Sequence, residues 1–110
     1  MPHTAFISLS SNLPSPEGGP GLNLDRGLES IAAKTDILAL SKRYLTTPVG
    51  VKMEMPDFVN QVVKIRWENS APELLKFLLE TEARFGRKRM DDKSLGPLAR
   101  TLDLDILLFG

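Results

Sequence analysis

The chain has 110 residues, of which 42% are apolar and 25% charged, a balance typical of one globular domain covering residues 1–110. Its 14 acidic and 14 basic residues cancel, which argues against nucleic acid or an anionic membrane as the main partner. The lack of cysteine excludes disulfides, thiolate metal sites and cysteine nucleophiles. No apolar run reaches membrane-spanning length and the first residues do not form a secretory signal, so we expect a soluble cytoplasmic protein.

The first half of the chain predicts a strand, a helix and a second strand. Residues 4–10 have the pattern of a short strand, and a loop rich in proline and glycine follows. A helix should begin near Leu22, and residues 37–46 then predict one further strand. The apolar face of this helix is expected at positions spaced for one side of a helix: Leu24, Leu28, Ile31 and Ala32.

Residues 58–67 predict a strand with two different faces. Gln61 interrupts the apolar face, while Phe58 and Asn60 share the other face because they are two residues apart. An aromatic ring beside an amide suits a flat heterocycle that carries hydrogen-bond donors and acceptors. Taken alone, Phe58 is more often a core residue than a stacking surface.

The clearest helix signal begins at Ser70. Ser70 and Glu73 form a capping box, and Gly86 supplies the stop. Glu82, near the end of this helix, is most simply a solvent-facing residue when taken alone. The buried stripe is expected to comprise four leucines: Leu74, Leu75, Leu78 and Leu79.

The order of these elements predicts the fold class. Strand, helix, strand, strand, helix, strand is the ferredoxin-like βαββαβ order of an α+β protein. We expect a four-stranded antiparallel sheet with two helices on one face. The opposite face would then be free to bind a ligand.

The last strand, residues 102–109, carries the most informative pattern. Asp103 and Asp105 alternate with aliphatic residues, so both carboxylates should leave one face, with alpha carbons about 6.6–7 Å apart. At that separation they repel by about 2–2.5 kcal/mol at an effective dielectric near 20. Mg²⁺ would relieve this repulsion, because it takes oxygen ligands and often combines one or two carboxylates with substrate phosphates. The plainer alternative is an edge strand with a solvated acidic face.

Basic residues gather just before this strand. Arg87, Arg89 and Arg100 stand in a short stretch with three further basic residues. Arginine binds phosphate through two parallel hydrogen bonds. Next to a pair of aspartates, such a stretch favours a site for phosphate and metal over a merely solvated basic surface.

Several short motifs occur together along nearly the whole chain. The most specific is Arg100-Thr101-Leu102-Asp103-Leu104-Asp105 followed by residues 106–110. Together the motifs resemble the 6-hydroxymethyl-7,8-dihydropterin pyrophosphokinase family of folate biosynthesis. The others, in the order of that family, are Ser11-Asn12-Leu13, Tyr44 with Thr46, Pro48-Val49-Gly50, Pro56 to Asn60, Glu82, Gly86-Arg87 with Arg89, and Gly96-Pro97.

The resemblance implies a transfer of pyrophosphate from ATP to the hydroxymethyl group of a reduced pterin. Two Mg²⁺ ions would be held by Asp103 and Asp105, and the other partners would be these two small molecules, with no nucleic acid or membrane. The chain would be a monomer or a homodimer paired through its last strand. The implied residues are Arg87, Arg89 and Arg100 for catalysis, Thr46, Val49, Phe58 and Asn60 for the pterin, and Glu82, Arg89, Arg100 and Ile106 for the nucleotide.

The chain departs from the family pattern at several positions. Ser10 stands where the family has glycine, Leu95 where it has tryptophan, and Leu98-Ala99 are inserted before Arg100. The family also continues beyond the position of Gly110. A second interpretation therefore stays open, in which the chain binds pterin or nucleotide without efficient transfer. In a third, the open sheet face or the last strand edge binds a protein or RNA partner, although a single aromatic residue on that face and zero net charge argue against RNA.

Overall fold

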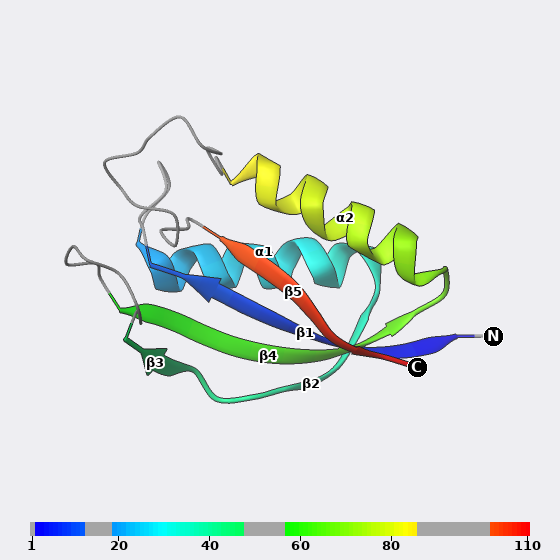
Figure 1. Ribbon diagram of the computed structural model, residues 1–110, viewed down its shortest axis with the longest axis horizontal. Coiled ribbons are helices and arrows are strands. Elements are labelled where there is room, and N and C mark those ends of the chain that lie inside the picture. Colours follow the sequence, from blue (N-terminus) through cyan, green and yellow to red (C-terminus); the bar gives the residue numbers. More distant parts are fainter. Residues whose placement is uncertain (1, 13–18, 48–56, 86–101) are drawn as a thin grey trace.

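The computed structural model describes residues 2–12, 19–47, 57–85 and 102–110, which form one antiparallel sheet and two helices (Figure 1). Across the described strands the order is β2-β4-β1-β5, and β3 also pairs with β4. Neither described helix is long and apolar enough to cross a membrane. The elements are β1 (His3–Ser11), α1 (Pro20–Lys34), β2 (Asp36–Leu40), β3 (Tyr44–Thr46), β4 (Phe58–Trp67), α2 (Ala71–Arg84) and β5 (Asp103–Phe109).

The described sheet has five strands, because the predicted second strand is divided into β2 and β3. At the break, Ser41 Oγ accepts a hydrogen bond from Val62 N at 2.8 Å, and Gln61 Nε2 donates to Ser41 O at 2.8 Å. A side-chain hydroxyl thus takes a β4 amide that a strand carbonyl would otherwise take. The polar Gln61 that interrupts the apolar face of β4 is the side chain that holds this break in place.

Both helices pack on the same face of the sheet, as the order of the elements predicts. Residues at alternate positions of β1 and β4 point into one core, where they meet one row of side chains from each helix. Full burial of a valine, leucine or isoleucine side chain contributes about 1.5–3 kcal/mol. The core consists of Ala5, Ile7, Leu9, Leu24, Ile31, Val63, Ile65, Trp67, Leu74, Leu78, Leu102 and Leu104.

The row that α1 presents to the sheet passes through a glycine. Gly27 is buried, and a methyl group added there would lie 3.2 Å from Leu102 Cδ2 and 3.3 Å from Leu9 Cδ2. The missing side chain therefore lets α1 approach the sheet closely. Ala32 is exposed, so its predicted place on the apolar face is wrong. The sheet-facing side of the helix runs through position 27 instead.

The start of α2 follows the predicted capping signal. Ser70 is the N-cap, and its hydroxyl accepts a hydrogen bond from Glu73 N at 3.4 Å. Pro72 stands in the first turn, where its missing N–H costs nothing. The predicted stop at Gly86 lies outside the described residues, and the helix ends at Arg84.

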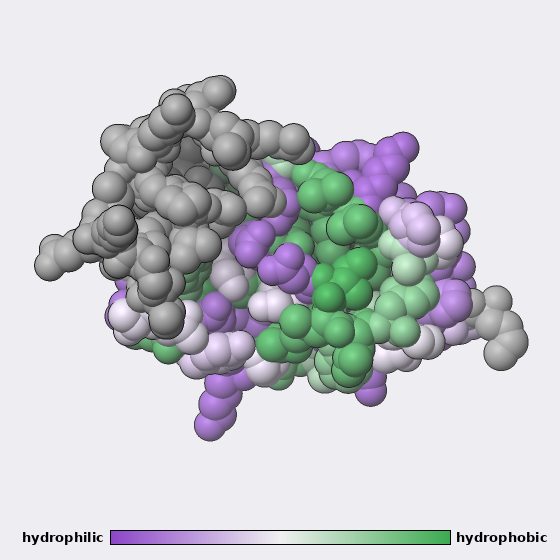
Figure 2. Space-filling view, in the orientation of Figure 1, coloured by the Kyte–Doolittle hydropathy of each residue, from purple (hydrophilic) through white to green (hydrophobic). Residues whose placement is uncertain are grey.

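The predicted apolar stripe of α2 is half wrong. Leu74 and Leu78 are buried, but Leu75 and Leu79 are 48% and 46% exposed. The reason is that α2 lies over β5, the last strand of the described sheet, so only one row of its side chains meets the core. Figure 2 shows an apolar area that spans α2 and β5 on the surface. Leu108 of β5 is 66% exposed.

Candidate ligand site on the open sheet face

The face of the sheet opposite the helices carries a row of polar residues. The register pairs Ser10 of β1 with Asn60 of β4 on one side and with Asp103 of β5 on the other. Ser8, two residues earlier, pairs with Asp105. Residues directly opposite each other in an antiparallel sheet share a face. An amide, a hydroxyl and a carboxylate therefore follow one another across three strands.

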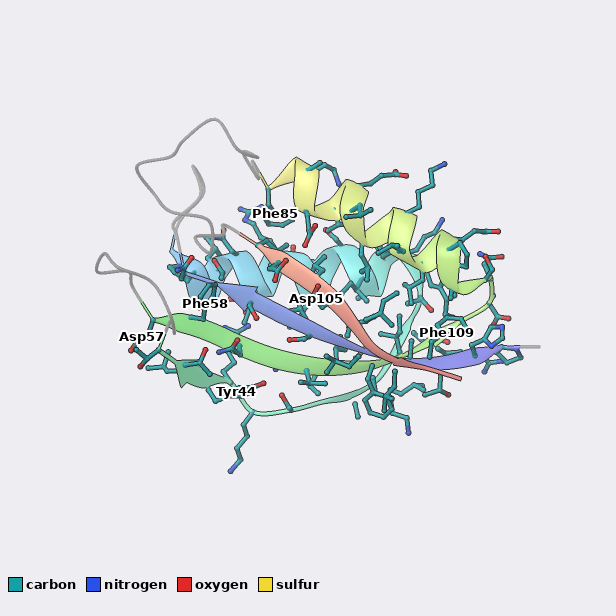
Figure 3. The ribbon with its side chains drawn as sticks, viewed as in Figure 1. Tyr44, Asp57, Phe58, Phe85, Asp105 and Phe109 are labelled. Atoms are coloured by element: carbon teal, nitrogen blue, oxygen red, sulfur yellow. The ribbon has the colours of Figure 1, made fainter. Side chains whose placement is uncertain are left out.

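Asp103 and Asp105 leave the same face of β5, which confirms the orientation that their spacing predicts. Asp103 is half-buried and Asp105 is exposed, while Leu102 and Leu104 point into the core. Figure 3 labels Asp105 on β5. Two carboxylates on an accessible face fit a hard divalent cation that keeps water or phosphate oxygens as further ligands. In the described part of the chain no three acidic, histidine or cysteine side chains gather into a cluster, so such a cation would complete its coordination with other oxygen atoms, such as those of water or phosphate.

A buried carboxylate holds the aspartate strand from its outer side. Glu82 of α2 is 2% exposed, and its Oε2 accepts a hydrogen bond from Leu104 N at 2.7 Å. In the described sheet β5 has a neighbouring strand on one side only, and Glu82 supplies an acceptor on the other. Since Leu104 lies between Asp103 and Asp105, this bond fixes the backbone that carries both. The solvent-facing alternative for Glu82 is wrong.

The Asn60 side chain is held in one orientation. It is 8% exposed, and its Nδ2 donates to Tyr44 O at 3.1 Å, Phe58 O at 3.1 Å and Thr46 Oγ1 at 3.0 Å. Ser10 Oγ donates to Asn60 Oδ1 at 2.8 Å. Backbone carbonyls only accept hydrogen bonds, so the amide nitrogen must face them and the amide oxygen must face Ser10.

Phe58 lies beside this amide and outside the core. It is half-buried and stands opposite Thr46 of β3 in the register. Its neighbour Val59 packs against the core instead, so the core alternative for Phe58 is wrong. Figure 3 shows Phe58 and Tyr44 towards the end of the sheet that lies away from the two termini.

The side chain of Ile106 packs against the core. In the register of the sheet, Ile106 is paired with Ile7 of β1. The backbone amide of Leu104 points outward to Glu82, and strand geometry directs the amide of Ile106 to the same outer side. Any contact that Ile106 makes at this edge is therefore a backbone contact. The other predicted positions, Val49, Arg87, Arg89 and Arg100, lie outside the described residues, as do the departures Leu95, Leu98 and Ala99.

The hydrogen bond between Ser10 and Asn60 does not follow from the sequence, since 50 positions separate the two residues. A weaker signal is present. Ser8 and Ser10 are small polar residues at alternate positions of a strand whose other face is apolar, which marks that side as the one turned away from the core.

The fold and this row of side chains define an α+β domain with a candidate small-molecule site on the open face of its sheet. The model of the 7,8-dihydro-6-hydroxymethylpterin-pyrophosphokinase (HPPK) family matches residues 6–110. The chain therefore belongs to this family.

Proteins named 2-amino-4-hydroxy-6-hydroxymethyldihydropteridine pyrophosphokinase are similar over nearly the whole chain. The one from Haemophilus influenzae is 39% identical over 109 residues, 97% of this chain and 62% of the relative. The Synechocystis protein is 36% identical over 111 residues, 98% of this chain and 51% of the relative. The Pseudomonas aeruginosa protein is 37% identical over 110 residues, 100% of this chain and 64% of the relative. The chain thus spans about half to two thirds of the length of these relatives.

Proposed function

We propose that this chain transfers pyrophosphate from ATP to 6-hydroxymethyl-7,8-dihydropterin in the cytoplasm, with Mg²⁺, in folate biosynthesis. The observation that carries the proposal is the row of Asn60, Ser10 and Asp103 across three strands of a chain that belongs to the pyrophosphokinase family. Neighbouring strands are about 4.8 Å apart, which separates the amide from the first carboxylate by about 10 Å. A fused two-ring heterocycle with a hydroxymethyl arm is suited to such a span.

The heterocycle would lie at the β4 end of this row. The fixed amide of Asn60 would read its polar edge, and the half-buried ring of Phe58 would stack on it. Thr46, whose hydroxyl accepts from Asn60, would contribute its backbone, and Val49 would add an apolar contact. The exposed arm of the heterocycle would then extend across β1 towards β5.

The triphosphate would lie at the β5 end. Asp103 and Asp105 would hold two Mg²⁺ ions, which when bound neutralise phosphate charge and orient the reacting groups. The hydroxymethyl oxygen forms a bond to the β-phosphorus and loses its proton to solvent, while the bond from that phosphorus to the AMP oxygen breaks. Such a transfer needs alignment more than covalent participation by the protein. Arg87, Arg89 and Arg100 would contact the phosphates and stabilise the charge that moves to AMP.

The nucleotide would lie along the outer side of β5. Its ribose would be near Glu82, whose carboxylate already accepts from Leu104 N. Its base would contact the backbone of Ile106, which has an amide directed to that side. We also infer that the fold is ferredoxin-like, since β2 and β3 together take the place of one strand in the order β2-β4-β1-β5.

The decisive experiment measures AMP formation from ATP with 6-hydroxymethyl-7,8-dihydropterin and Mg²⁺. The double variant Asp103→Asn, Asp105→Asn should lower the rate about 10³-fold or more, because the cation ligands are lost. Asp36→Asn, which changes an exposed aspartate of β2, is the matched control and should keep the rate. Equal rates in wild type and the double variant would remove the two aspartates from the mechanism.

If the wild-type chain forms no AMP, two interpretations remain: binding without efficient transfer, and no ligand site at all. Calorimetry with Mg²⁺, a non-hydrolysable ATP analogue and hydroxymethylpterin distinguishes them. Binding of both ligands would support a protein that binds without efficient transfer. Binding of neither would contradict the proposed site as well as the activity.

A second candidate function is self-association through β5. Leu107 and Leu108 of this strand are 52% and 66% exposed. The strand β5 is one of the two elements over which the apolar area in Figure 2 extends. In the described sheet β5 lies at one end of the strand order. An apolar strand at such an edge is a template for pairing with a second copy. Analytical ultracentrifugation over a range of concentrations would reveal such a homodimer.

A further inference from the structure

We propose that Ser10 strengthens the selection of the heterocycle in this chain, an inference that rests on the proposed function. Ser10 occupies the centre of the polar row, opposite Asn60 on one side and Asp103 on the other. Its hydroxyl lies 2.8 Å from Asn60 Oδ1 and donates to it. A glycine at this position would leave the row without its central polar group.

The hydrogen-bond donors of this pair are all used within the protein. The Asn60 amide has two N–H groups, and three acceptors surround them: Tyr44 O, Phe58 O and Thr46 Oγ1. The single proton of the Ser10 hydroxyl is directed to Asn60 Oδ1. Neither side chain therefore has a hydrogen left to donate to a ligand.

Acceptor capacity remains on both residues. A carbonyl oxygen has two lone pairs, of which Asn60 Oδ1 uses one for Ser10, and a hydroxyl oxygen has two lone pairs of its own. The pair thus offers two adjacent acceptors, 2.8 Å apart, to whatever lies over it. The complementary ligand edge carries two neighbouring N–H donors.

A 2-amino-4-oxopteridine carries such an edge, made of its 2-amino group and its ring N3–H. The 2,4-dioxo analogue has a carbonyl in place of the amino group, so an acceptor would meet an acceptor. Sites built to bond an N–H reject analogues that lack it, because a buried polar group is left without a partner. Ser10 supplies the second acceptor of the pair, which an alanine or a glycine would remove.

Fluorescence titration without Mg²⁺ tests this selection apart from the metal site. Affinities for 6-hydroxymethylpterin and for the matching 2,4-dioxopteridine are measured for the wild type, Ser10→Ala and Ser10→Thr. We expect Ser10→Ala to reduce the preference for the amino heterocycle about tenfold, the usual value of one hydrogen bond in a desolvated site. Ser10→Thr keeps the hydroxyl and should keep the preference. Ser8→Ala, on the same face of the same strand, is the matched control and should also keep it.

The outcomes separate this inference from the proposed function. A wild-type chain that binds neither heterocycle would contradict the pterin site itself. A wild-type preference that Ser10→Ala retains would overturn only the role of Ser10, as would a wild type without any preference. Equal weakening of both ligands in Ser10→Ala would also overturn it, because that result indicates a structural role alone. Circular dichroism on each variant confirms that the fold is kept.

Discussion

The two ends of the polar row are held in different ways. At one end, Asn60 belongs to a strand with neighbours on both sides, and four hydrogen-bond partners fix its side chain. At the other end, β5 has one neighbouring strand in the described sheet, and Glu82 of α2 supplies a contact on its outer side. This difference suits the proposed site, in which one end would recognise a flat ring and the other would accommodate phosphates and cations. The first end is preorganised, whereas the second depends on a helix.

The largest effect should come from reversing the hydrogen-bond polarity of Asn60. Asn60→Asp replaces a donor by an ionised acceptor facing the carbonyls of Tyr44 and Phe58, which should cost about 3 kcal/mol of unfolding free energy. Urea denaturation measures this loss. Asn69→Asp changes an exposed amide and serves as the control, with little change expected. A stable Asn60→Asp variant would show that this end is less rigid than its contacts indicate.

The next effect concerns the contact between α2 and β5. Glu82→Leu leaves Leu104 N without its acceptor, which should cost about 2 kcal/mol, while Glu82→Gln keeps an acceptor and should cost less. Hydrogen exchange of the Leu104 amide should speed up in Glu82→Leu. The KM for MgATP should rise while pterin affinity holds. If Glu82→Leu weakened the affinities for MgATP and for pterin equally, the two ends of the row would not be independent. Glu80→Gln, on the exposed side of α2, is the control.

A smaller effect on stability is expected from Arg43, which contacts Gln61, the residue next to Asn60. The Arg43 guanidinium donates to Gln61 Oε1 at 3.0 Å and to Gly21 O at 3.2 Å, and it also pairs with Asp25. Arg43→Met should cost about 0.5–1 kcal/mol, because the group is partly exposed and solvent screens the ion pair. Thermal unfolding measures the loss. The exposed neighbour Lys42→Met should leave stability unchanged, and an equal loss there would point to packing rather than hydrogen bonding.

The smallest effect should come from the exposed side of β5. Leu108→Lys should change the unfolding free energy by no more than about 0.5 kcal/mol, because Leu108 is 66% exposed. If β5 pairs with a second copy, the same variant should abolish the dimer seen by sedimentation. Leu45→Lys on β3, where the side chain is 67% exposed, provides the control on another strand. A large loss of stability in Leu108→Lys would show that this edge supports the monomer.

Much of the fold follows from local patterns in the sequence. The alternation of residues 58–67 predicts the two faces of β4, and the spacing of Asp103 and Asp105 predicts their common face. The capping residue Ser70 predicts where α2 begins. These features depend on neighbours along the chain, and a period of two or a cap is sufficient to reveal them.

What the sequence does not reveal depends on partners far along the chain. The division of the second strand depends on the Ser41 hydroxyl, which takes the amide of Val62. The burial of Glu82 depends on the amide of Leu104, and helical periodicity treats that glutamate as an ordinary surface residue. Likewise, four leucines on α2 predict a broad stripe, but a helix over the last strand of the described sheet needs only a narrow one.

The lack of a side chain at Gly27 allows close contact between the helix layer and the sheet layer of this domain. Because Gly27 has only hydrogen where other residues have a carbon, α1 can rest against Leu102, the residue that immediately precedes Asp103. Enlarging position 27 by a single carbon would displace that leucine by a few tenths of an ångström, or oblige Leu9 to yield. The position of Asp103, a proposed cation ligand on the open face, therefore depends on the lack of a side chain at residue 27 on the helix side of the sheet.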